Sequence, residues 1–402
     1  MLRASHQRLL ICLFAAATVI ANPRTAFAAP KTPQRVAVNP LAAVPNSGGS
    51  REMRLLRAID TGNRKLINEI IASGVNPNVR NAQGNSALMR AALLGYADIC
   101  NALIKAGADV NYATPRGDTA LIFAAFTGKP AVCDLLLARG ADASISDKYG
   151  YTPLLSATIR GDASIVTSLL EAGASPNKPD RKGDTPLRYA ARDSRTDIAQ
   201  ILLDHGAEID IANDEKITAL LQASLRDDVP TTQFLLEHGA NPNLADEHGR
   251  LPLVIAVRDG AEPLCRVLLD AHADAVLSWA STPPIFMALK VDRPDLMEAL
   301  LDGGADSNLR DSQGRTPLLF AVQRHNITIA KMLLDHGANP STASKNGLTP
   351  LMIAARDGRA DLAKLLLTRG ANTLAKANGM DAATVALNFH HPDIAKLIKR
   401  GM

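Results

Sequence analysis

The segment TPLLSATIRG, residues 152–161, decides the fold, because it has the pattern of a short helix with a marked start and a marked end. Thr152 is of a type that caps helices, and Pro153 suits the first helical turn, where its fixed φ fits and its missing N–H is no loss. Ala157 and the residue after it follow Leu154 by three and four positions, so all three would lie on one face of a helix. Gly161 then ends the helix. The segment therefore predicts a short α-helix.

The next segment, SIVTSLLEAG at residues 164–173, shows the same apolar spacing and predicts a second helix. Gly173 can adopt the left-handed conformation of a helix end without a steric cost. The Pro- and Asn-containing residues 174–177 and the stretch from Asp180 to Gly183 then predict an extended turn. One unit is thus a helix, a turn, a second helix and a hairpin-like loop.

This unit recurs along the chain with a period of 33 residues, shortened twice to 32. The units open at Met53, Ser86, Thr119, Thr152, Thr185, Thr218, Leu251, Pro283, Thr316, Thr349 and Asp381. In nine units a glycine follows the opening after 21 residues, at Gly74, Gly107, Gly140, Gly173, Gly206, Gly239, Gly304, Gly337 and Gly370. Neither helix of a unit buries its apolar stripe alone, so neighbouring units must stack. Residues 51–402 therefore predict an all-α solenoid of about eleven helix-turn-helix units.

The period, the Thr-Pro-Leu box and the Leu-Leu-x-x-Gly-Ala-Asp/Asn helix ending resemble the ankyrin repeat. The resemblance covers about 350 residues in eleven copies and implies the ankyrin-repeat fold. Hydrophobic residues make up 47% of the chain and aromatic residues 3%, which suits small helices packed through Leu, Ile, Val and Ala.

The amino terminus has the pattern of an export signal. Two arginines, Arg3 and Arg8, precede a 13-residue apolar run from Leu9 to Ala21, and Ala26-Phe27-Ala28 offers a cleavage site after Ala28. The run is shorter than the roughly 20 residues that span a bilayer, so we expect no stable membrane anchor. We predict a signal peptide at 1–28, a Pro/Gly/Ser-rich linker at 29–50 and a periplasmic or secreted location. An export route in a eukaryote stays open.

The charge balance argues against a nucleic-acid partner. Loss of residues 1–28 would remove three arginines and no acidic residue, so the net charge would fall from +4 to about +1. We expect a monomer with a protein partner.

The sequence contains no recognisable catalytic, metal or cofactor constellation, and we predict no enzyme, metal or cofactor. Cys100, Cys133 and Cys265 all lie 14 residues after a unit opening, as buried small hydrophobes too far apart to pair. Three histidines precede C-cap glycines and are expected to interact with helix ends: His205, His238 and His336. The His390-His391 pair lacks further ligands at a suitable spacing.

Irregular loops lie between residues 206 and 283. Lys216 and His272 stand where other units have glycine, and the loop after His272 is one residue shorter and contains Trp279, the chain's single tryptophan. We expect a rebuilt loop and a weak joint that separates six units from five, with a hinge near His272. Trp279 is either partly exposed or packed on its own hairpin. The loop from His272 to Pro284 is either a hinge or a binding feature.

The resemblance implies that a partner docks on the concave side, formed by hairpin tips and first helices. The expected contact residues are Phe126, Lys148, Tyr149, Tyr151, Arg160, Arg181, Arg192, Arg226, Arg250, Arg258, Arg315, Arg324 and Arg356. Their arginines would form a ridge for an acidic partner, with the aromatic residues as anchors. Alternatively, the arginines pair with neighbouring acids such as Asp193, Asp227, Asp259 and Asp357.

The function that these patterns favour is a non-enzymatic protein-interaction scaffold or inhibitor. A small-molecule binder, or an enzyme whose pocket the sequence does not reveal, is the alternative. The identity of the partner does not follow from the scaffold, because the surface of each loop varies independently of the fold.

Overall fold

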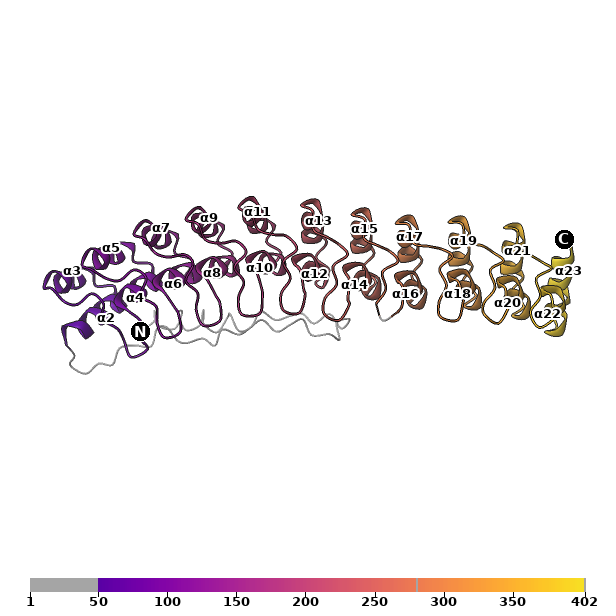
Figure 1. Ribbon diagram of the computed structural model, residues 1–402, viewed down its shortest axis with the longest axis horizontal. Helices are drawn as coiled ribbons and strands as arrows, with labels where there is room; N and C mark the ends of the chain where they lie inside the picture. Colours follow the sequence, from indigo (N-terminus) through magenta and orange to yellow (C-terminus); the bar gives the residue numbers. More distant parts are fainter. Residues whose placement is uncertain (1–49, 280, 401–402) are drawn as a thin grey trace, which may run out of the picture. The chain divides into compact units, whose positions relative to one another are not determined.

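The computed structural model describes residues 50–279 and 281–400, so the expected signal peptide and the expected linker, apart from Ser50, lie outside the described residues. In this part of the chain, 22 α-helices form eleven consecutive pairs (Figure 1). The first helices of the pairs are α2 (Arg51–Thr61), α4 (Ala87–Leu94), α6 (Ala120–Thr127), α8 (Pro153–Arg160), α10 (Pro186–Arg192), α12 (Ala219–Ser224), α14 (Pro252–Asp259), α16 (Pro284–Val291), α18 (Pro317–Gln323), α20 (Pro350–Arg356) and α22 (Ala382–Asn388). The second helices are α3 (Arg64–Ala72), α5 (Ala97–Lys105), α7 (Pro130–Ala138), α9 (Ala163–Glu171), α11 (Thr196–Asp204), α13 (Val229–Glu237), α15 (Glu262–Asp270), α17 (Pro294–Asp302), α19 (Ile327–Asp335), α21 (Ala360–Thr368) and α23 (Pro392–Arg400).

Each first helix contacts its own second helix and the first helices of the neighbouring pairs. The second helices contact their neighbours in the same way from α3 to α11 and from α13 to α23, so the pairs stack in two rows (Figure 1). The expected all-α solenoid is confirmed. None of the helices among the described residues is both long and apolar enough to cross a bilayer.

The helix boundaries follow from the residues that the sequence singles out. The Leu155 amide donates a hydrogen bond of 3.1 Å to the Thr152 hydroxyl, and Pro153 occupies the first turn of α8. Gly161 ends the helix with a φ of +81°. Threonine caps of the same geometry begin α6, α10, α12, α18 and α20. A cap of this kind stabilises a helix by about 1 kcal/mol, so the caps set the boundaries repeatedly along the chain.

The core consists of aliphatic side chains that are shared between neighbouring pairs. Leu154, Ala157 and Leu169 are fully buried, as the spacing of unit 152–184 predicts. Burial of one leucine side chain contributes about 1.5–3 kcal/mol, and the small alanine allows helices to approach closely. Each pair is therefore stabilised by its neighbours.

The turn at His272 itself keeps the regular geometry, and the rebuilt part of the expected loop begins after it. His272 adopts a φ of +61°, and its amide donates to the Leu269 carbonyl at 2.9 Å. Gly206 makes the equivalent bond, to Leu203, at 3.0 Å. The histidine therefore accepts the left-handed conformation, at a cost of about 1–2 kcal/mol, and the irregularity begins further along the loop.

The two large clusters of buried apolar residues meet between the sixth and seventh pairs, where a small cluster of Ile217, Leu221 and Ile255 connects α12 with α14. One cluster of buried apolar residues extends from Leu55 to Ala240 and the other from Leu253 to Ile398, and the half-buried Leu236 contacts both. This boundary lies within the stretch from 206 to 283 where we expected a weak joint, and a hinge near His272 stays a prediction. The residues on either side of His272, Leu269 and Ala273, belong to the second cluster, because α15 packs directly on α17.

The carboxy-terminal pair presents both charged and apolar residues to solvent. Lys396, Lys399 and Arg400 are exposed. Two apolar side chains of this pair, Leu387 and Phe389, are also 50% and 51% exposed.

Candidate protein-interaction surface

One polar side chain closes each regular hairpin between pairs. The Asp147 carboxylate accepts hydrogen bonds from the amides of Tyr149 at 2.8 Å and Tyr151 at 2.9 Å. Asp180 accepts equivalent bonds from Lys182 and Asp184 at 2.8 and 3.0 Å. Aspartate and asparagine are suited to this role because their short side chains reach the backbone two residues further on. The bonds hold the residues at the hairpin tip in one conformation.

Backbone hydrogen bonds also join successive hairpin tips. The Lys148 amide donates to the Arg116 carbonyl at 2.7 Å, and the Arg181 amide donates to the Tyr149 carbonyl at 2.9 Å. A Cβ atom on Gly150, whose φ is +88°, would lie 2.8 Å from the Arg181 nitrogen, so this approach requires glycine. Equivalent bonds continue through two further tips. We call the five tips 114–118, 147–151, 180–184, 213–217 and 246–250 the tip strip.

The tip strip stops at the irregular hairpin 274–282. Trp279 occupies the place of the closing aspartate, and its indole N–H donates to the His248 carbonyl of the preceding tip at 3.2 Å. A Cβ atom on Gly249 would have no neighbour within 4 Å, in contrast to Gly150. Trp279 is partly exposed, which agrees with one of our two alternatives, and its hydrogen bond reaches the neighbouring hairpin rather than its own.

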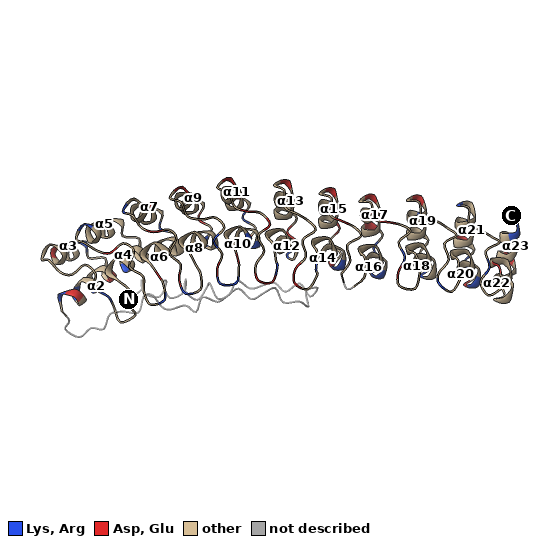
Figure 2. Cartoon of the chain, in the orientation of Figure 1, with Lys and Arg blue, Asp and Glu red and all other residues tan. Residues whose placement is uncertain are grey.

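The first three tips of the strip present basic side chains to solvent. Lys148, Arg181 and Lys182 are exposed, and Arg116 is half-buried. In Figure 2, lysine and arginine gather on the loops that precede α6, α8 and α10. The next two tips instead expose Asp214, Glu215 and Glu247, alongside Lys216 and His248. The exposed charge of the strip is thus mainly positive in its amino-terminal part and mixed in the next two tips.

Two aromatic residues of the expected surface are accessible. Tyr149 is 38% exposed, with the Lys148 ammonium 4.7 Å from its ring centre. Phe126, near the end of α6, is 42% exposed. An exposed aromatic ring beside cations is typical of the residues that contribute most to protein interfaces.

The arginines at the ends of the first helices do not form one continuous ridge. Three of them bind the aspartate that follows in the sequence: Arg192 with Asp193 at 2.8 Å, Arg258 with Asp259 at 2.7 Å and Arg356 with Asp357 at 2.7 Å. This is the pairing that the sequence offered as the alternative. Arg250 and Arg315 bind the closing aspartates of their own hairpins, at 2.5 and 2.7 Å. Arg160, Arg226 and Arg324 are exposed.

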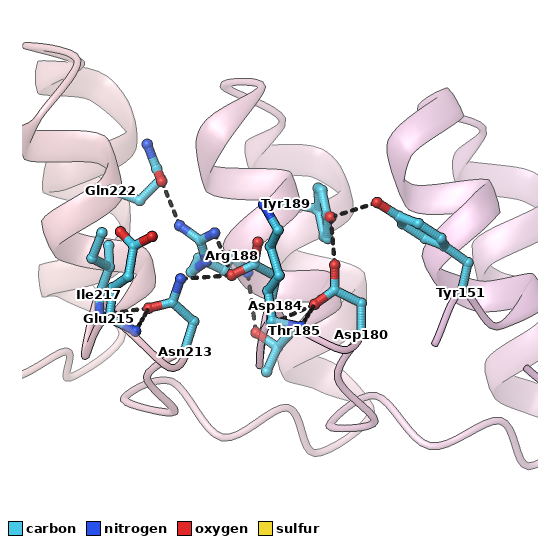
Figure 3. A network of polar contacts seen from close by, with 11 residues as sticks. Tyr151, Asp180, Asp184, Thr185, Arg188, Tyr189, Asn213, Glu215, Ile217 and Gln222 are labelled. Atoms are coloured by element: carbon cyan, nitrogen blue, oxygen red, sulfur yellow. Dashed lines mark hydrogen bonds and ion pairs between the residues drawn. The ribbon is translucent and has the colours of Figure 1, made fainter. Parts of the chain in front are cut away.

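Tyr151 lies in the interior, which corrects its expected place on the surface. The side chain is 7% exposed, and its hydroxyl is 3.1 Å from that of Tyr189 (Figure 3). The Tyr189 hydroxyl in turn donates to Asp180 at 2.8 Å, and the Arg192 guanidinium lies 4.6 Å from the Tyr189 ring centre. Tyr151 therefore connects the hairpin to the first helices and supports the surface from below.

A buried ion pair continues this polar network into the next unit. The Arg188 guanidinium forms an ion pair with Asp184 and donates to the Gln222 amide oxygen, and Asn213 donates to Asp184 at 2.8 Å (Figure 3). Sequence reasoning missed these residues. The signal was present: Arg188 stands where the neighbouring units have Leu155 and Leu221. A buried arginine requires a charged partner, because desolvation of an unpaired charge costs several kcal/mol.

The two tyrosines remain protonated at neutral pH. Burial, together with the hydrogen bond to Tyr151, raises the pKa of Tyr189 far above its ordinary value, and burial also raises the pKa of Tyr151. Both hydroxyls can therefore act as hydrogen-bond donors, and neither is a base near pH 7. The network is structural in character.

The cysteines and histidines lie where the sequence placed them. Cys100, Cys133 and Cys265 are free and buried, and burial raises the pKa of each thiol to about 12. The Nδ1 atoms of His205, His238 and His336 lie 2.8, 2.8 and 2.9 Å from carbonyls one turn earlier, which confirms helix capping. Among residues 50–279 and 281–400, no three His, Cys, Asp or Glu side chains form a group that could hold a metal ion.

Stacked helix pairs with hydrogen-bonded hairpin tips define a repeat protein whose surface is a regular array of loops. A family model described as ankyrin repeats (3 copies) matches residues 55–147, 128–213, 207–279, 278–344 and 340–402. The chain belongs to the ankyrin-repeat family. Repeats of this kind generally mediate protein–protein interactions.

The chain is also similar to a curated protein, the poly [ADP-ribose] polymerase tankyrase of Caenorhabditis elegans. The two are 29% identical over 68 residues, which is 17% of this chain and 3% of that protein. A match of this extent spans only a small part of the relative, and it is consistent with a shared repeat.

Proposed function

We propose that this protein is a non-enzymatic interaction module that binds a protein partner along the tip strip and acts as a scaffold or an inhibitor. The observation that carries the proposal is the set of bonds between successive tips, such as Lys148 to Arg116 and Arg181 to Tyr149. Side chains on a surface held in this way lose little conformational entropy when a partner binds. A rigid array of exposed charges and aromatic rings is therefore well suited to protein recognition.

The second part of the proposal concerns location. The basic start, the apolar run and the site after Ala28 support export to the periplasm or outside the cell, followed by cleavage. Mass spectrometry of the exported protein should give a chain that begins at Ala29. An intact Met1 in the exported protein would contradict cleavage.

The test of partner binding is affinity capture. The exported chain, immobilised, should retain a discrete protein from periplasmic extract, and the triple substitution K148E/R181E/K182E should weaken retention. A matched control is K331E/K364E/K396E, which changes the net charge equally at exposed lysines on second helices. Equal retention by both variants would place the partner elsewhere. If the extract yields no protein and a metabolite instead raises the melting temperature, a small-molecule function replaces this one.

A further inference from the structure

We propose that the amino-terminal part of the tip strip binds an extended, acidic protein segment that carries an aromatic or aliphatic anchor residue. The inference rests on the proposed function and names the chemistry of the partner. The basic surface consists of Arg116, Lys148, Arg181 and Lys182, and the apolar row consists of Leu93, Phe126 and Ile159. The basic surface and the apolar row lie on the same side of the helix pairs.

The apolar row occupies one equivalent position in three consecutive first helices. Leu93, Phe126 and Ile159 each follow the capping residue of their helix by seven positions, in α4, α6 and α8, which pack side by side. Ile159 packs against a cluster that includes Tyr151, a residue of the hairpin 147–151. The equivalent position in α10, Arg192, lies over the Tyr189 ring, whose hydroxyl reaches the same hairpin. This position therefore faces the side on which the tips lie.

The distances suit an extended chain. Seven helical residues separate Phe126 from its cap Thr119, which is about 10 Å along the axis of α6. Three residues of an extended peptide span about the same length. An anchor residue placed on Phe126 thus leaves acidic residues three or more positions away within reach of the tips.

The charge that these tips expose to solvent is mainly positive, because Asp147, Asp180 and Asp184 are buried and Asp118 is half-buried, with a hydrogen bond from the Thr114 hydroxyl at 3.3 Å. Asp147 and Asp180 are buried and accept backbone hydrogen bonds within their hairpins. Asp184 is buried against Arg188. The carboxylates that are nearest in sequence are therefore committed to structure, while Lys148, Arg181 and Lys182 face solvent. Charge complementarity then favours an acidic segment.

The charge of the tips and the extent of the apolar row also define where the bound partner segment ends. The tips 213–217 and 246–250 expose carboxylates at Asp214, Glu215 and Glu247, and these would repel an acidic chain. The seventh position also becomes charged at Arg192, which is already paired with Asp193. The bound partner segment therefore covers the helix pairs from α4 to about α10. A nucleic acid is also acidic, but it offers no aliphatic anchor for the apolar row.

The experiment selects peptides without assuming a partner. A library of random 12-residue peptides is selected against the exported full chain, and the enriched peptides are labelled and titrated by fluorescence anisotropy. We expect enriched sequences with a net negative charge and at least one Phe, Trp, Leu or Ile. Their binding should weaken as salt is raised, because exposed charges are screened.

Two pairs of variants locate the site. K148E/R181E/K182E should weaken peptide binding about 50-fold, while the charge-matched K331E/K364E/K396E should change it less than about twofold. Phe126→Ala should weaken binding about tenfold, while Phe389→Ala, which removes another exposed ring, should have no effect. Circular dichroism verifies that all four variants fold, which their exposure to solvent predicts.

Several results would overturn the inference. These are enriched peptides that are neutral or basic, peptides insensitive to K148E/R181E/K182E, or a twelve-nucleotide oligothymidylate that binds as tightly as the peptides. If affinity capture retains a protein whose binding ignores the basic surface, the inference fails and the proposed function stands. If neither the extract nor the library yields a protein or peptide ligand, both fail.

Discussion

The hairpin around Gly150 and the hairpin around Trp279 occupy equivalent places in the repeat but close in different ways. In the first, Asp147 binds two amides of its own loop, and the next tip approaches so closely that a Cβ atom on Gly150 would lie 2.8 Å from it. In the second, an indole replaces the carboxylate and binds the preceding loop. The first hairpin belongs to a continuous strip of tips, and the second interrupts it.

This difference shows which local features let neighbouring tips join. A short polar side chain closes the loop, and a residue with a positive φ, glycine in most tips and Lys216 at +60° in the tip 213–217, allows the next backbone to approach. Where Trp279 stands, the loop is also one residue shorter and exposes Val276 and Leu277, at 49% and 38%. The helices on both sides pack normally, so the fold tolerates the loss of one joint between tips.

The largest expected effect comes from breaking the buried ion pair beneath the strip. Asp184→Ala leaves the Arg188 guanidinium buried without a charged partner, so the free energy of unfolding should fall by about 3–5 kcal/mol. Asp361→Ala breaks the exposed pair with Arg359, and its effect should be much smaller because water screens the two charges. Urea unfolding of the full chain measures both. Equal losses in the free energy of unfolding would show that burial does not determine how much an ion pair stabilises this chain.

The next effect tests the close approach of the tips directly. Gly150→Ala and Gly249→Ala both place a side chain at a positive φ, which costs about 1–2 kcal/mol. Only Gly150→Ala also forces the neighbouring tip to move, so we expect it to destabilise the chain by about 3 kcal/mol in total. Thermal unfolding of the two variants compares them. A loss at Gly249 as large as that at Gly150 would contradict the interruption of the strip.

A third pair compares the two ways of closing a hairpin. Asp246→Ala removes an acceptor for the amides of His248 and Arg250 and the ion pair with the Arg250 side chain, so it should cost about 2 kcal/mol. Trp279→Ala removes one hydrogen bond to a partly exposed group and should cost about 1 kcal/mol. Amide hydrogen exchange in residues 246–250 should accelerate more in the first variant. Faster exchange in Trp279→Ala than in Asp246→Ala would show that Trp279 contributes more than Asp246 to holding this tip in place.

The smallest effect concerns a joint on the far side of the interruption, between α17 and α19. The Met332 carbonyl, assisted by Asp302, raises the pKa of His336 above its ordinary value of about 6.5. The folded chain therefore gains stability from protonated His336 below about pH 6.5 and loses it as the pH rises through the folded-state pKa.

Because His336 is partly exposed, the gain should stay below about 0.5 kcal/mol. The stability difference between the natural chain and His336→Gln, measured from pH 5 to pH 8, should shrink with rising pH. A difference that is constant across this range would exclude the interaction.

The structure also shows where reasoning from one sequence succeeds and where it fails. The caps at Thr152 and Thr185, the left-handed glycines and the buried cysteines follow from patterns that repeat within a few residues, and all are confirmed. Tyr151 fails because its neighbour Tyr189 lies 38 residues away. Its position in a loop suggested exposure, whereas the adjacent unit covers it.

The sequence by itself determined the helix-pair repeat, its period, its caps and its division into eleven units, because each depends on local spacing and on interactions between near neighbours along the chain. Only the tertiary structure decided which arginines pair with the next aspartate, that Tyr151 is buried, and that the tips join from 114 to 250 but not at Trp279. The burial of Tyr151 and the joining of the tips arise between units about 33 residues apart. They depend on how one unit packs on the next, and the residue pattern within one unit does not specify these contacts between units.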